Sequence, residues 1–147
     1  MGHASAEPSC GVVLHLQSGI VAMGLIYARI GAISYGVWGA FHLYVAYQIY
    51  ALALTEQGLS QGRLFQLAAY MLTISLFVLV VALTRNWRND ATGYWLNLAV
   101  ASWADVIWIL IVVLPGYVPA ARGLVPPAFW ALGALFTTLA YRAGRRA

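Results

Sequence analysis

The chain has 147 residues, of which 63% are hydrophobic and 8% are charged, with a formal net charge of +4. This composition lies far outside the balance of soluble domains and predicts an integral membrane protein. All 8 basic residues are arginine and lie mainly where apolar runs end, so they indicate membrane topology rather than a surface for nucleic acid.

The first 27 residues are predicted to form an N-terminal tail ahead of the membrane domain. Residues 1–10 are small and polar, contain Pro8 and show no periodicity, which is typical of a flexible tail. Residues 11–27 are moderately apolar but are interrupted by His15, Gln17 and Ser18, so they suit an interfacial helix. No Lys or Arg precedes this run, which disfavours a cleaved signal peptide.

Four longer apolar runs follow, and each is predicted to cross a bilayer as a helix. We place these spans at about residues 30–54, 64–84, 94–114 and 124–143. Polar turns at 55–62 and 85–93 and a proline-containing break at 115–123 separate them, and Pro126 with Pro127 suits the start of a helix. Because the links are short, we predict one domain, residues 28–147, folded as an all-α antiparallel bundle of four transmembrane helices.

The arginines predict how this bundle is oriented. Two of them, Arg63 and Arg122, fall on one side, and the other six fall on the opposite side: Arg29, Arg85, Arg88, Arg142, Arg145 and Arg146. Since basic residues are enriched on the cytoplasmic side, we expect both ends of the bundle to lie in the cytoplasm.

Small residues in the first span predict close helix packing. Ala28, Ala32, Gly36 and Ala40 recur at i, i+4 spacing, which brings them to one face of a helix. That face suits another helix of the bundle or a second copy of the chain. The expected partners are therefore the lipid bilayer and either a homo-oligomer or a larger membrane complex, without nucleic acid.

Two ionisable side chains are predicted to lie in the middle of the membrane. Asp105 interrupts the third apolar run within the sequence WADVIW, and His42 lies within the first. Counted from the cytoplasmic ends, they lie about 11 and about 12 residues into their spans, roughly 17 Å deep at about 1.5 Å per residue. A direct hydrogen bond between His42 and Asp105 would reduce the cost of burying each.

Three readings of this pair remain open, and the sequence leaves it undecided whether the protein is an enzyme. The first is a structural lock in a non-catalytic accessory or assembly subunit. In the second, the two side chains act as catalytic or binding groups for a lipid-like or terpenoid ligand, because intramembrane acids are functional candidates by default. The third is a proton or small-ion pathway. Helical spacing gathers five candidate ligand-binding residues around the pair: Tyr35, Trp38, Asn97, Ser102 and Trp108.

No cofactor and no metal ion are predicted. The sequence contains no Cys/His cluster with metal-site spacing, no glycine-rich phosphate loop and no nucleophile elbow. We also consider haem binding by His42. None of the other spans contains a histidine, so the second haem ligand would have to be His42 of another copy across a dimer axis.

The start of the first span, ARIGAISYGVWGAFHLYVA from Ala28, places an arginine at the membrane edge before a glycine-punctuated helix. This pattern resembles small bacterial four-helix membrane proteins of the DoxX-like group, and the resemblance extends over Ala28 to Tyr141 as architecture. It implies a bacterial inner-membrane location. Some members of that group are tied to quinone-linked sulfur oxidation, but no residue-level motif here transfers that activity.

Overall fold

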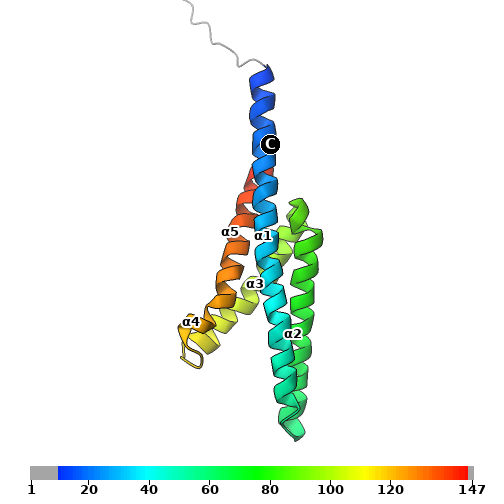
Figure 1. Ribbon diagram of the computed structural model, residues 1–147, viewed down its shortest axis with the longest axis vertical. Coiled ribbons are helices and arrows are strands. Elements are labelled where there is room, and N and C mark those ends of the chain that lie inside the picture. The colour runs from blue at the N-terminus through cyan, green and yellow to red at the C-terminus, as the bar shows by residue number, and fades with distance from the viewer. Residues whose placement is uncertain (1–9, 146–147) are drawn as a thin grey trace, which may run out of the picture.

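Residues 10–145 are described by the structure, a computed structural model, with side chains described from residue 17 onward. The helical elements in chain order are α1 (Cys10–Ala53), α2 (Gly58–Thr84), η1 (Asn86–Arg88), α3 (Ala91–Trp108), η2 (Ile109–Val113), α4 (Ala120–Gly123) and α5 (Val125–Gly144). η1 is a single 3₁₀ turn and η2 is a π-helical continuation of α3. The four long helices α1, α2, α3 and α5 form one bundle (Figure 1).

Four helical stretches in the described part of the chain are long and apolar enough to cross a membrane. They are residues Gln17–Ala53, Gly58–Arg88, Ala91–Val113 and Ala120–Gly144. This finding confirms the predicted fold class, an all-α bundle of four transmembrane helices. Many large apolar side chains point outward, among them Tyr44, Val80 and Leu110, each more than half exposed. An outer surface of this kind is typical of a protein that contacts lipid or other membrane proteins.

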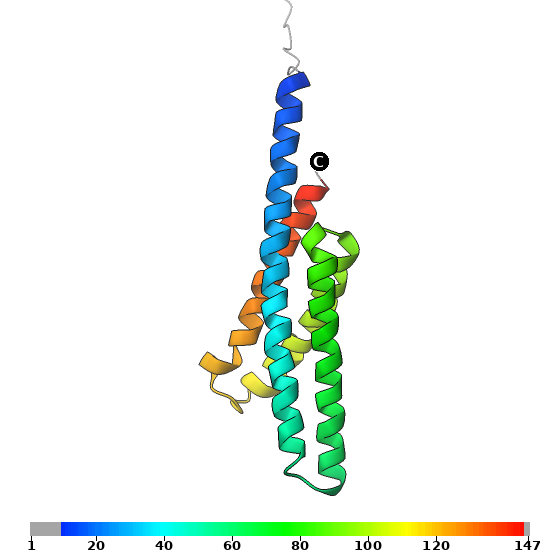
Figure 2. The ribbon, with the colours of Figure 1, turned by 45° about the vertical axis from the view of Figure 1, so that its right-hand side comes forward.

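α1 is longer than the predicted first span. It begins at Cys10 and continues without interruption to Ala53, so residues 10–27 are its first turns and do not form a separate interfacial helix. No proline or turn sequence lies between His15 and Arg29, and a helix tolerates single polar residues. Its 44 residues span about 66 Å, and the N-terminal turns project beyond the other helices (Figure 2). The predicted flexible tail, residues 1–10, lies almost entirely outside the described residues.

Glycines allow α1 to approach two neighbouring helices closely. A Cβ added at Gly31 would lie 2.6 Å from Thr137 Cγ2 of α5, and one added at Gly39 would lie 3.2 Å from the Ser75 carbonyl oxygen of α2. α1 thus packs closely against α5 at Gly31 and against α2 at Gly39.

The predicted ladder of small residues follows this division. Close packing within the bundle is confirmed for Ala28 and Ala32, which are buried. Ala40 is exposed, and a Cβ added at Gly36 would be 4.0 Å from its nearest neighbour, Leu79 Cδ1. The close-packed face of α1 therefore shifts from α5 toward α2 after Ala32, and the regular i, i+4 ladder does not continue along one interface.

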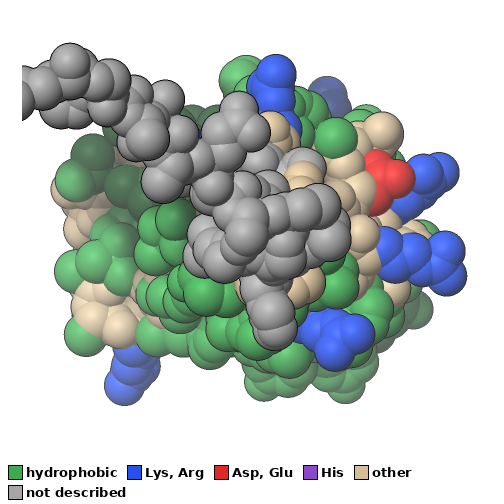
Figure 3. Space-filling model, turned by 90° about the horizontal axis from the view of Figure 1, so that it is seen from above, with side chains coloured by type: hydrophobic (Ala, Val, Ile, Leu, Met, Phe, Trp, Pro, Cys, Tyr) green, Lys and Arg blue, Asp and Glu red, His purple; other side chains and the backbone are tan. Residues whose placement is uncertain are grey.

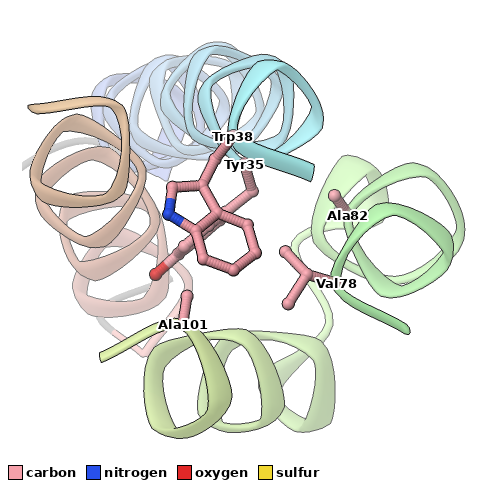
Figure 4. Packing of buried hydrophobic residues seen from close by; sticks show 5 residues of the cluster. All are labelled: Tyr35, Trp38, Val78, Ala82 and Ala101. Atoms are coloured by element: carbon pink, nitrogen blue, oxygen red, sulfur yellow. The ribbon is translucent and has the colours of Figure 1, made fainter. Parts of the chain in front are cut away.

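The centre of the bundle is filled by two aromatic side chains from α1. Tyr35 and Trp38 are fully buried and pack with Val78 and Ala82 of α2 and Ala101 of α3 (Figure 4). α1 and α3 lie diagonally across the bundle in this view, with α2 and α5 between them. Only long side chains bridge such a diagonal.

Basic side chains gather at the end of the bundle where α3 begins and α5 ends. Figure 3 shows them around the rim of this end. The Arg29 guanidinium lies 5.6 Å from the centroid of the Trp87 ring, and Arg85 forms an ion pair with Asp90 at 3.2 Å. We call this the arginine-rich end, defined by the described residues Arg29, Arg85, Arg88, Arg142 and Arg145. Arg146 lies outside the described residues.

Asp90 starts α3 at this end. Its Oδ1 accepts hydrogen bonds from the backbone N–H groups of Thr92 at 2.7 Å and Gly93 at 3.1 Å. The Gly93 bond, together with the Arg85 side chain and the Thr92 N–H, holds the pKa of Asp90 below its ordinary value of 3.8. The stability that this carboxylate contributes is therefore fully present above its ordinary pKa and is lost as the pH falls through the lowered value.

We expect Asp90→Ala to lower the free energy of unfolding by about 1 kcal/mol, because the helix loses its N-cap. Asp90→Asn should keep the N-cap. Its free energy of unfolding should fall less at acid pH than that of the wild type, because the titrating carboxylate is gone. Thermal unfolding in detergent micelles, followed by circular dichroism from neutral pH to about pH 3, measures both effects. Identical acid sensitivity in the wild type and Asp90→Asn would contradict this assignment.

Candidate functional site

Asp105 is held by a tryptophan from the diagonally opposite helix. The Trp38 indole Nε1–H donates a hydrogen bond to Asp105 Oδ2 at 2.6 Å. Asp105 is 1% exposed and Trp38 is 0% exposed, so the pair is sealed from the membrane. A partnered carboxyl group in such surroundings avoids much of the cost of an unpaired polar group.

His42 lies one helical turn after Trp38 and packs against it with the two rings tilted by 30°. The two ring centroids are 3.8 Å apart, and His42 Nδ1 lies 2.9 Å from the Trp38 carbonyl oxygen. A carbonyl oxygen only accepts hydrogen bonds, so Nδ1 carries the hydrogen and donates it. In the neutral ring, Nε2 then presents a lone pair, and no described residue donates to it.

The direct hydrogen bond between His42 and Asp105, which the sequence left open, is not formed, because each side chain bonds to Trp38. The depth count brings both residues near the same level, but depth says nothing about the direction in which each side chain points around its helix. α3 is also tilted relative to α1 in Figure 1, so equal residue counts do not give equal depths. Trp38, one turn nearer the arginine-rich end, is the residue that reaches Asp105.

The other candidate residues lie in helix contacts around this centre. The Asn97 amide donates to the Val78 carbonyl oxygen at 3.2 Å, which ties α3 to α2. Ser102 Oγ accepts from Trp130 Nε1 at 2.9 Å, which ties α3 to α5. Tyr35 packs its ring against Gly133, where an added Cβ would lie 3.0 Å from the ring.

Next to His42 lies an apolar cavity of about 390 Å³ between α1, α2 and α3, which we call the α2–α3 groove. It occupies the half of the bundle away from the arginine-rich end. Apart from His42, its wall is almost wholly apolar, and Asp105 does not line it. The lining residues are Phe41, His42, Val45, Ile49, Leu67, Met71, Ile74, Trp103, Ala104, Ile107, Trp108, Ile111, Val112 and Pro126.

The structure therefore divides the predicted site residues into two groups. His42 and Trp108 line the groove, whereas Asp105, Trp38 and Tyr35 are closed inside the bundle. Sequence reasoning missed the contribution of α2, which includes Met71. A methionine in an apolar run carries no signal that separates a groove wall from ordinary packing.

Among the described residues, no group of three or more His, Cys, Asp or Glu side chains is placed to hold a metal ion. The chain matches no protein-family model, no curated protein and no solved structure. The resemblance to DoxX-like proteins stays a prediction, and the functional argument rests on the site itself.

We expect Trp38 and Asp105 to be energetically coupled. Each of Trp38→Phe and Asp105→Leu leaves one buried partner without its hydrogen bond, whereas the double variant removes both polar groups. A double-mutant cycle should give a coupling energy of about 0.6–2 kcal/mol, as for polar pairs between membrane helices. Unfolding by titration with a denaturing detergent measures it.

Asp105→Asn is the matched control for this cycle, because its side-chain oxygen still accepts from the indole. Its free energy of unfolding should stay near that of the wild type. A coupling energy of zero, with every variant folded, would rule out the Trp38–Asp105 bond as a stabilising contact.

Proposed function

We propose that this small integral membrane protein binds an elongated apolar molecule from the bilayer in the α2–α3 groove. One observation carries the proposal: an apolar groove with a single histidine in its wall, whose Nε2 lone pair has no donor among the described residues. Small-molecule sites typically combine an apolar wall with a few polar groups that fix orientation, and their volumes begin at about 300 Å³.

The tautomer of His42 defines the chemistry of the ligand's polar end. Because Nδ1 donates to the Trp38 carbonyl, Nε2 is an acceptor and requires a hydroxyl or another donor. A lipid-like or terpenoid alcohol meets both requirements, an apolar body and one donating group. Binding rather than acid–base catalysis is favoured, because Asp105 bonds to Trp38 and does not line the groove, so the two ionisable groups do not face a common substrate.

The isoprenoid alcohol farnesol and the corresponding hydrocarbon farnesene test this proposal as a matched ligand pair. Farnesol should bind the wild-type protein in lipid nanodiscs more tightly than farnesene does. His42→Phe should weaken farnesol binding about fivefold, the value of one hydrogen bond of about 1 kcal/mol, and should leave farnesene unaffected. Equilibrium dialysis with radiolabelled ligands gives both dissociation constants.

Ala104→Phe should abolish binding of both ligands, because the new ring fills the groove. Ala99→Phe, on an exposed part of the same helix, is the matched control and should bind like the wild type. Equal farnesol binding by the wild type and Ala104→Phe would place the ligand elsewhere and refute the groove as its site.

A second candidate function is that of an accessory or assembly subunit, favoured by exposed apolar side chains in the first half of α1. The turns of α1 that lie beside and just before the end of α5 expose apolar side chains, including Val21, Met23 and Ile26. Such a surface suits contact with a helix of another membrane protein or of a second copy.

A photo-crosslinking residue at Met23 tests the subunit role in intact membranes. It should give one discrete protein adduct, identified by mass spectrometry as the same partner in repeated preparations. The same residue at Val80, an equally exposed position on α2, should give lipid adducts alone. Lipid adducts alone at both positions would refute the subunit role.

We also propose that the arginine-rich end faces the cytoplasm of a bacterial inner membrane. The support for the orientation is the distribution of basic residues, with Arg63 and Arg122 at the opposite end of the bundle. The support for the bacterial membrane is the resemblance to DoxX-like proteins.

A further inference from the structure

A second cavity lies at the arginine-rich end, where α3 begins and α5 ends. Its volume is about 480 Å³, and we call it the α3–α5 pocket. Three aromatic rings form much of its wall. The Tyr94 and Tyr141 rings stack with centroids 4.7 Å apart and an interplanar angle of 10°, and the Trp95 ring meets the Tyr94 ring edge-on at 4.9 Å. The remaining lining residues are Thr138, Arg142 and Arg145.

Hydrogen bonds within the protein occupy part of this lining. Thr138 Oγ1 donates its hydrogen to the Ala134 carbonyl oxygen at 2.6 Å. The Tyr94 hydroxyl, 3.2 Å from Thr138 Oγ1, must therefore be the donor in that contact. Both hydroxyl hydrogens are already used, so neither is available to a ligand.

The unused donors of the pocket belong to Tyr141 and the two arginines. Arg145 donates one N–H to the Tyr141 hydroxyl oxygen at 3.3 Å, which leaves the Tyr141 hydrogen and the other Arg145 N–H groups available. The ion pair found among the described residues joins Arg85 to Asp90, so neither pocket arginine has a carboxylate partner in that part of the chain. Two arginines without a carboxylate partner among the described residues and a phenol hydrogen therefore border one cavity.

We propose that the α3–α5 pocket binds the phosphate headgroup of an anionic phospholipid. Guanidinium groups match the oxygens of a phosphate in a bidentate geometry, and the Tyr141 hydroxyl adds a further donor. The pocket lies where two apolar spans end and beside Trp95, which is more than half exposed. Tryptophan and tyrosine at the end of a span mark the headgroup level of a bilayer.

The position of the pocket favours a lipid over free phosphate. Both offer the same oxygens, but a lipid also places its acyl chains along the apolar outer surface below the pocket. The pocket and the α2–α3 groove share no lining residue and lie in opposite halves of the bundle, so this inference is independent of the proposed function.

Native mass spectrometry of the full chain in detergent tests the proposal. The probes are phosphatidylglycerol and phosphatidylcholine with identical acyl chains, mixed in equal amounts. The wild type should retain phosphatidylglycerol in preference to phosphatidylcholine. Replacing both pocket arginines, Arg142→Gln with Arg145→Gln, should reduce that retention by about fivefold for each arginine.

Two matched variants distinguish a specific binding site from a nonspecific effect of positive charge. Arg85→Gln with Arg88→Gln removes the same charge from the same end and should leave retention nearly unchanged. Tyr141→Phe keeps the stacked ring and should weaken retention by about fivefold through the lost hydroxyl. Circular dichroism confirms that each variant is folded, and Tyr141→Phe tests the site even if the double arginine variant fails to fold.

Three results would overturn the proposal. Equal retention of the two lipids by the wild type would show that the pocket does not select an anionic headgroup. Equal losses of phosphatidylglycerol retention in the two double arginine variants would show that general positive charge, and not the pocket, holds the lipid. Release of bound phosphatidylglycerol by excess inorganic phosphate, with no effect of excess phosphatidylcholine, would make free phosphate the ligand; unchanged retention under excess phosphate supports the lipid.

Discussion

The hydrogen bond between Trp38 and Asp105 fixes the rotation of two helices that do not pack directly together. α1 and α3 lie diagonally across the bundle, and the indole spans the space between them (Figure 4). Polar bonds between membrane helices contribute only about 0.6–2 kcal/mol, so this bond adds more to specificity than to stability. Turning either helix would leave a buried carboxyl group or a buried indole N–H without a partner, which an apolar interior penalises.

This constraint also determines what His42 can do. The imidazole packs against the indole and donates to the backbone of the same residue, so only its second nitrogen is left as an acceptor for the proposed ligand. The carboxyl group and the imidazole thus have different roles. Asp105 holds the bundle centre through Trp38, and His42 supplies the polar atom of the groove.

The sequence was sufficient for the fold class. Long apolar runs separated by short polar turns identify membrane helices, because lipid requires every backbone group to be bonded within a helix. Asp105 was recognised because a carboxylate inside such a run is costly. Its partner was not predicted, since residue counting measures position along a helix and not the direction around the bundle. Trp38 and His42 are one turn apart, so only the packing of α1 against α2 and α5 decides which of them meets α3.

The groove depends on features that no periodicity reveals. α3 continues into the π-helical segment η2, whose wider turn changes the register of the side chains that follow. Two residues of this segment, Ile111 and Val112, line the groove.

Both the last residue of α3, Trp108, and the π-helical segment η2 contact α4. Trp108 donates its indole N–H to the Gly123 carbonyl oxygen at 2.8 Å, and a Cβ added at Gly123 would lie 2.9 Å from Val113 Cγ2. α4 therefore packs tightly on η2 and fixes its position. Because α4 holds this wall on one side and the Trp38–Asp105 bond holds α3 on the other, the groove is a preformed cavity between fixed helices. A preformed cavity requires little reorganisation when a ligand enters, which is the physical argument behind the proposed binding role.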